Sequence, residues 1–257
     1  MPATTTDLPV QRFPARDGML LAYREMGEGR PVVLLHGFIS NATVNWIRYG
    51  QAEALARVER RVVMPDLRGH GDSAEFGLAG AYPPDVLADD GFALIEHLGL
   101  DEHDLVGYSL GARTAIRMLV RGDAAGRAVV AGTGLEPILH AAGRGGYYRR
   151  VLAPGATFPI GSDEWRTQQF VRSVGGDAGE LLPVLETLVD TPLDALARVD
   201  IPVLVLAGDQ DDDHGSVEAL ADALPRGRVQ RVPGDHMTVV ARAAFGAAIV
   251  AFLGNGG

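Results

Sequence analysis

The sequence of 257 residues contains no cysteine and no lysine. The missing cysteines exclude disulfides, thiolate metal sites and cysteine nucleophiles. Because all 23 basic residues are arginine, Schiff-base chemistry and a phosphate-loop lysine are excluded as well. No apolar stretch is long enough to cross a bilayer, and the first ten residues lack the pattern of a signal peptide. We therefore expect a cytoplasmic protein without membrane contact.

Positive charge is also scarce. The chain carries 33 acidic residues, which gives a net charge of −10. Nucleic acid is therefore an improbable partner, because phosphate binding requires a positive field and no basic cluster is present. The length fits one large domain with a substantial core. The composition gives no indication of the oligomeric state.

Short apolar runs alternate with helical patterns along most of the chain. This alternation predicts an α/β fold with a mostly parallel central sheet flanked by helices. A glycine turn at 16–18 predicts an antiparallel hairpin at the start, and one long helix is expected over 41–58. The predicted strands cover residues 10–13, 19–24, 32–35, 61–65, 104–108, 128–131, 201–207 and 228–232.

The alternation stops after the sixth predicted strand. Residues 133–199 are rich in glycine and aromatic residues and are too long for a simple connection. We interpret them as a helical lid, with helices at 162–173 and 180–189, and residues 1–132 and 200–257 as the core. Aromatic side chains in such a segment usually form the core of the lid rather than the wall of a pocket.

Ser109 stands between two glycines in Gly107-Tyr108-Ser109-Leu110-Gly111, directly after an apolar run. A serine on a sharp turn from strand to helix has a strained backbone, and glycines on either side avoid the clashes that side chains would cause. The pattern predicts an exposed hydroxyl nucleophile at the start of a helix. A plain glycine turn can have the same pattern, so the chemistry depends on partners elsewhere in the chain.

A serine nucleophile needs a base and donors for the oxyanion that forms when it attacks a carbonyl. The backbone N–H of Leu110, at the start of the helix, is one candidate donor. The other is the N–H of Phe38 in His36-Gly37-Phe38, which follows the run at 32–35. That position lies at the carboxyl edge of the sheet, where open α/β sheets bind ligands.

An acid and a base follow in the order that an α/β-hydrolase triad requires. A group of aspartates comes after the run at 201–207, and His236 comes after the last predicted strand. The loop residue His70 is better interpreted as structural than as a base. The seven histidines show no metal-ligand spacing, and those expected to be structural or surface residues are His36, His97, His103, His140 and His214.

These features together resemble the α/β-hydrolase superfamily, in its compact esterase, lactonase and haloperoxidase-like branch. The resemblance extends from about residue 10 to residue 253. It implies that Asp211 is the triad acid, with Asp209 and Asp212 as alternatives, and that the Phe38 and Leu110 N–H groups form the oxyanion hole. It is carried by residues 36–38, 66–73, 107–111, 208–211 and 234–237.

The resemblance implies a serine hydrolase that cleaves a carboxylic ester, thioester or lactone with an apolar portion, without metal or cofactor. Hydrolysis of a carbon–carbon bond in a diketone, lyase or perhydrolase chemistry remains possible on the same scaffold, as does a non-catalytic receptor. Epoxide hydrolase chemistry is disfavoured because those relatives have aspartate where Ser109 stands. The residues expected to contact substrate are His36, Gly37, Ile39, Tyr108 and Trp165.

Overall fold

The computed structural model describes residues 8–73 and 81–254. Three segments of the predicted core, residues 1–7, 74–80 and 255–257, lie outside the described residues. Within the described ranges, every helix is too short or too polar to span a lipid bilayer.

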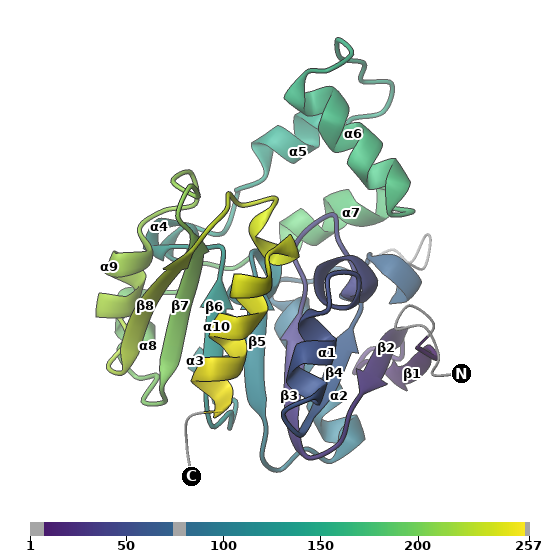
Figure 1. Cartoon of the computed structure of the whole chain (residues 1–257). Helices are drawn as coiled ribbons and strands as arrows, with labels where there is room; N and C mark the ends of the chain where they lie inside the picture. The colour runs from purple at the N-terminus through teal and green to yellow at the C-terminus, as the bar shows by residue number, and fades with distance from the viewer. Residues whose placement is uncertain (1–7, 74–80, 255–257) are drawn as a thin grey trace.

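One sheet of eight strands organises the chain, in the order β1-β2-β4-β3-β5-β6-β7-β8 (Figure 1). The first two strands form the predicted hairpin, β2 pairs antiparallel with β4, and every other pair is parallel. The predicted mostly parallel α/β fold is therefore confirmed. The strands are β1 (Gln11–Pro14), β2 (Leu20–Met26), β3 (Arg30–Leu35), β4 (Arg60–Pro65), β5 (Asp104–Tyr108), β6 (Ala128–Ala131), β7 (Val203–Gly208) and β8 (Gly227–Val232).

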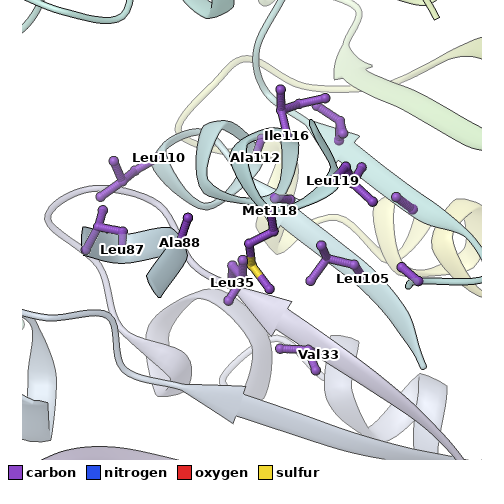
Figure 2. Packing of buried hydrophobic residues seen from close by; sticks show 14 of the residues in the cluster. Val33, Leu35, Leu87, Ala88, Leu105, Leu110, Ala112, Ile116, Met118 and Leu119 are labelled. Atoms are coloured by element: carbon purple, nitrogen blue, oxygen red, sulfur yellow. The ribbon is translucent and has the colours of Figure 1, made fainter. Parts of the chain in front are cut away.

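The central strands are apolar on both faces because helices cover both sides of the sheet. Val33 and Leu35 face the cluster formed with α2 (Val86–Leu98) and α3 (Leu110–Val120). Val32 and Leu34 face the cluster formed with α1 (Gln51–Ala56) and α10 (Ala243–Gly254). This is the two-residue alternation of a strand buried on both sides. Figure 2 shows the Met118 side chain of α3 extending toward Leu35 and Leu105 of the sheet. This packing fixes α3, and with it the turn at its start.

The helices connect successive strands. They are α1 (Gln51–Ala56), α2 (Val86–Leu98), α3 (Leu110–Val120), α4 (Leu135–Leu139), α5 (Gly146–Val151), α6 (Asp163–Ser173), α7 (Ala178–Val184), α8 (Leu193–Leu196), α9 (Val217–Asp222) and α10 (Ala243–Gly254). Single 3-10 turns occur at Gly71–Ser73, Leu185–Thr187 and Val239–Ala241.

The long helix predicted over 41–58 is broken. A π-helical turn covers Thr43–Ile47, and α1 begins only at Gln51, after Gly50 adopts a left-handed backbone with φ 78°. The wide turn carries Asn45, whose side-chain oxygen accepts a hydrogen bond from the Gly37 N–H at 3.1 Å. The break therefore lets this segment support the loop after β3, which an uninterrupted helix would not do.

The predicted lid is shorter than 133–199 in the structure. Figure 1 shows α5 and α6 standing above the sheet, with α7 closer to it. In contrast, α4 and α8 pack onto the core, because Ile138 and Leu196 belong to the apolar cluster that contains α3. The Thr191 N–H donates to the Ile138 carbonyl at 3.0 Å and joins the two ends of the insertion. We call residues 141–189, between α4 and α8, the cap.

Candidate active site

Ser109 lies in the sharp turn between β5 and α3. Its backbone has φ 52° and ψ −105°, which is outside the ordinary regions for a residue with a side chain. A Cβ atom on Gly107 would lie 2.2 Å from the Gly111 carbonyl oxygen, and one on Gly111 would lie 2.1 Å from the Leu35 carbonyl oxygen. Only glycine fits at both positions, which is the physical reason for the pattern seen in the sequence.

Three side chains from distant parts of the chain meet at this turn. The Ser109 Oγ is 3.2 Å from His236 Nε2, and His236 Nδ1 is 2.9 Å from Asp211 Oδ2. Because a carboxylate can only accept, His236 Nδ1 carries the proton, and Nε2 presents its lone pair to the serine hydroxyl. Serine, histidine and aspartate thus form one hydrogen-bonded chain with the polarity that general-base activation requires.

The geometry selects one acid among the aspartates after β7. Asp211 is 5% exposed and faces His236. Asp209 is exposed and accepts a hydrogen bond from the Gly234 N–H at 3.0 Å, which holds the loop before the histidine. Asp212 is exposed to solvent. Asp211 is therefore the carboxylate that the fold pairs with the histidine.

His214, which we expected to be a structural or surface residue, lies in the site. Its Nδ1 is 2.6 Å from Asp211 Oδ1, so each oxygen of this carboxylate accepts from a different imidazole. The His214 ring also stacks on the His236 ring, with 3.5 Å between centroids and 11° between planes. The only sequence signal for this position is its spacing of three residues from Asp211 within one turn.

The electrostatics of the three groups follow from this arrangement. Burial raises the pKa of Asp211, but the hydrogen bonds from His214 and His236 outweigh burial and hold that pKa well below its usual range. Burial is the main effect on His236 and lowers its pKa; the Asp211 hydrogen bond opposes this, and positive charge on His214 adds to the lowering. His236 is consequently neutral at neutral pH, as a base must be.

The loop after β3 brings the second predicted donor to the serine. Phe38 lines the same cavity as Ser109 and Leu110, and its ring packs edge-on against Tyr148 of the cap at 4.8 Å. The Leu110 N–H begins α3, where the first amide groups of a helix have no partner within the helix. Phe38 and Leu110 therefore lie with Ser109 around one cavity, and the oxyanion role of their N–H groups stays a prediction.

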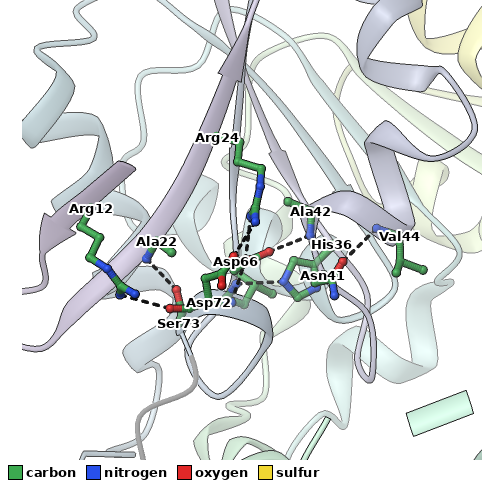
Figure 3. Close-up of polar contacts among 11 residues, drawn as sticks. Arg12, Ala22, Arg24, His36, Asn41, Ala42, Val44, Asp66, Asp72 and Ser73 are labelled. Atoms are coloured by element: carbon green, nitrogen blue, oxygen red, sulfur yellow. Dashed lines mark hydrogen bonds and ion pairs between the residues drawn. The ribbon is translucent and has the colours of Figure 1, made fainter. Parts of the chain in front are cut away.

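Buried polar contacts hold this loop in place. Figure 3 shows Asp66 at the centre of a network in which its carboxylate accepts hydrogen bonds from the Ala42 and Asp72 N–H groups, at 2.8 and 3.0 Å. Arg24 completes the network with an ion pair to Asp66 at 3.1 Å. The carboxylate of Asp66 thereby ties together the loops after β3 and β4.

His36 belongs to this support and not to the cavity lining, which corrects our expectation of substrate contact. The Leu67 N–H donates to His36 Nε2 at 2.9 Å, so Nδ1 carries the proton and donates to the Gly37 carbonyl at 2.8 Å. Full burial lowers the pKa of His36 to about 4, which keeps the ring neutral. Its ring is fully enclosed, and both ring nitrogens form hydrogen bonds with backbone groups of the loops after β3 and β4.

A cavity of about 370 Å³ opens at the serine, which is a size suited to a small ligand. Gly37, Ile39 and Tyr108 line it, as we expected. Among the described residues, Trp165 is not part of the lining, which corrects that expectation. The larger apolar side chains of the lining are Phe38, Val44, Tyr49, Leu110, Tyr147, Tyr148, Phe170, Leu185, Leu188, Met237 and Val240.

Asp211, His214 and His236 also bring three possible metal-ligand atoms within 4.8 Å of one another. The nitrogen atoms that face the carboxylate already donate hydrogen bonds to it. A cation bound there would displace the proton on His236 Nδ1 and disrupt the chain to Ser109. The arrangement is therefore better suited to proton transfer than to holding a metal.

The sequence matches the Alpha/beta hydrolase family over residues 32–248. A non-heme haloperoxidase from Rhodococcus erythropolis is 35% identical over 109 residues, covering 42% of this chain and 37% of the relative. An epoxide hydrolase from Caballeronia sordidicola is 34% identical over 101 residues, covering 39% of this chain and 30% of the relative. The matched segments span about a third of the length of these relatives.

Solved structures match over almost the whole chain. A hydrolase from Pseudomonas aeruginosa PA01 has a TM-score of 0.75 and 25% identity, covering 95% of this chain and 98% of the other. A bromoperoxidase from Bacillus anthracis has a TM-score of 0.72 and 23% identity, covering 96% and 100%. An esterase from Thermogutta terrifontis has a TM-score of 0.70 and 24% identity, covering 95% and 98%. With a family match that includes Ser109, Asp211 and His236, the chain belongs to the alpha/beta hydrolase family.

Proposed function

We propose that the protein is a serine hydrolase that cleaves a carboxylic ester or lactone through an acyl-enzyme on Ser109. The observation that carries this proposal is the hydrogen-bonded chain from Ser109 through His236 to Asp211, which opens onto an apolar cavity. These are the groups that acyl transfer requires: a nucleophile, a neutral base, and an acid that orients the base.

In the first step, the Ser109 Oγ attacks the carbonyl carbon while His236 Nε2 takes the hydroxyl proton. Asp211 stabilises the imidazolium that results, and the Phe38 and Leu110 N–H groups bind the oxyanion. The ester C–O bond then breaks, and His236 returns its proton to the leaving alcohol. One oxyanion donor of this kind typically lowers the barrier by about 3 kcal/mol.

In the second step, water replaces the alcohol. His236 takes a proton from this water as its oxygen attacks the acyl carbon, and the second tetrahedral intermediate collapses to a carboxylic acid and free Ser109. In a lactone, the alcohol and the acid belong to one molecule, so the product is a single hydroxy acid. The cavity size and its apolar lining favour a substrate of modest size with an apolar portion.

Perhydrolysis is a second candidate, since relatives carry the names haloperoxidase and bromoperoxidase. Hydrogen peroxide would replace water in the second step and release a peracid. An assay with and without peroxide in the presence of acetate separates the two reactions.

Labelling by a fluorophosphonate probe, combined with a panel of short-chain esters, thioesters and lactones, tests the proposed function. Folded wild-type protein should be labelled at Ser109 and hydrolyse at least one class, and the Ser109→Ala variant should do neither. A folded protein that is neither labelled nor active on the panel would instead indicate a ligand-binding role for the cavity.

A further inference from the structure

Arg113 lies one helical turn after the serine and lines the same cavity. Its N–H donates to the Ser109 carbonyl at 3.2 Å, so the two residues are on the same side of α3. Four residues of helix correspond to about 6 Å along the axis. The guanidinium is therefore next to the space that a bound substrate would occupy.

This guanidinium has no partner among the described residues. Its Nε is fully buried without a hydrogen-bond acceptor, and no carboxylate of residues 8–73 or 81–254 forms an ion pair with it. The next arginine on the same helix, Arg117, makes two hydrogen bonds to Asp85 at 2.9 and 2.8 Å. The buried Arg68 is likewise paired, with Asp90 at 2.7 Å. Arg113 is only partly exposed and its buried Nε lacks an acceptor among the described residues, so an external anion would supply the missing partner.

The surrounding charges point in the same direction. Burial is the main cause that lowers the pKa of Arg113 to about 10, with a smaller contribution in the same direction from the nearby Arg144, and the group remains charged at neutral pH. Arg144 comes from the cap and also lines the cavity. The carboxylate of Asp213 is part of the lining too, but it is exposed and does not contact Arg113. Arg113 and Arg144 therefore both line the cavity, and Arg144 also lies close enough to the carboxylate of Glu136 to act on it electrostatically.

We propose that the substrate of this site carries a carboxylate, which Arg113 binds while Arg144 assists. This inference rests on the proposed hydrolysis at Ser109 and names the class of substrate: a monoester of a dicarboxylic acid, or a lactone with a carboxylate side chain. Guanidinium matches a carboxylate through two parallel hydrogen bonds. The distance along α3 places this carboxylate a few bonds from the carbonyl that Ser109 attacks.

The test compares two esters that differ only in charge. Mono-4-nitrophenyl adipate has a free carboxylate, and methyl 4-nitrophenyl adipate has the same chain with the charge masked. Wild-type kcat/KM for nitrophenolate release should be about 10- to 100-fold higher for the anionic ester, as expected for a charge-assisted hydrogen bond. Monoesters of glutarate and suberate would locate the preferred spacing.

Variants assign the preference to its source. Arg113→Met should bring the ratio of kcat/KM for the anionic ester to kcat/KM for the neutral ester close to one, and Arg113→Lys should restore part of this ratio. Arg166→Gln is the matched control, because Arg166 is exposed on α6, paired with Asp163 and absent from the cavity lining. Equal kcat/KM for the two esters in the wild type would overturn the proposal, as would a preference that survives in Arg113→Met.

A binding experiment separates this inference from the proposed function. Titration calorimetry should show that wild-type protein binds hexanoate at least tenfold more tightly than hexanamide, and that Arg113→Met does not discriminate between them. Discrimination without ester hydrolysis would refute the proposed function and keep the anion site. Hydrolysis of the neutral ester without discrimination would keep the function and refute the anion site. If Arg113→Met does not fold, the comparison of hexanoate with hexanamide on the wild-type protein still tests the anion site.

Discussion

Replacing Ser109 by glycine should make the protein more stable, although it removes the proposed nucleophile. The residue has φ 52° and ψ −105°, a backbone conformation that a Cβ atom makes unfavourable. Its environment maintains this conformation, because α3 is anchored by its packing on the sheet. Glycine can adopt such a conformation without the steric conflict.

The magnitude can be worked out from a comparison with alanine, which lacks the hydroxyl but keeps the Cβ atom. Backbone strain of this kind costs about 1–3 kcal/mol. Glycine also loses about 0.5–1 kcal/mol more conformational free energy than alanine on folding. From the midpoints of these two ranges, Ser109→Gly should exceed Ser109→Ala in stability by about 1.2 kcal/mol, which corresponds to a Tm higher by roughly 2–5 °C for a protein of this size.

Thermal and urea unfolding of the two variants measure this difference. Both should be inactive, so any change in stability is separate from activity. Ala251→Gly is the control, since it adds a glycine at an exposed position in α10 and should lower stability by about 1 kcal/mol. If Ser109→Gly melts at or below the temperature of Ser109→Ala, the turn does not store strain at this residue.

Three further predictions concern the base and its acid. Because burial lowers the pKa of His236, kcat/KM for ester hydrolysis should be constant at neutral pH and should fall with acidification only below the usual pKa range of imidazole. An inflection above that range would contradict the role of His236 as the base. Since charge on His214 also lowers the pKa of His236, the acid limb of the pH–rate profile should lie at higher pH in His214→Asn than in wild type. An unchanged profile would mean that the stacked His214 ring does not affect the pKa of His236. Asp211→Asn should reduce kcat by about 10⁴-fold, whereas Asp209→Asn, which alters only a loop contact, should cost less than tenfold; steady-state kinetics that rank the two the other way would reassign the acid.

The carboxylate of Asp211 has a double role in this structure. It accepts one hydrogen bond from the base and another from His214. With both oxygens occupied, the carboxylate cannot rotate without breaking a contact, so the second histidine holds the acid in the orientation that the base requires. His214 consequently acts through Asp211 and through its stacking on His236, without contacting Ser109.

The sequence alone determined the parts of the site that depend on local sterics. The turn at Ser109 could be predicted because glycines at 107 and 111 are required by close backbone contacts. The positions of Asp211 and His236 could be predicted to within one turn, because loops after parallel strands meet at one edge of the sheet. Apolar runs without alternation were sufficient to place the buried strands, since burial on both faces leaves no polar side.

Only the tertiary structure decided which side chains within these loops face one another. Asp211 differs from Asp209 and Asp212 in orientation, which depends on how the loops after β7 and β8 pack. The same packing stacks His214 on His236. His36, which we expected to contact substrate, is enclosed and instead supports the loops after β3 and β4. Whether Arg113 Nε finds an acceptor also depends on the three-dimensional surroundings, and within the described part of the chain it finds none. Distances between side chains on different loops depend on long-range packing, and no local pattern in the chain encodes them.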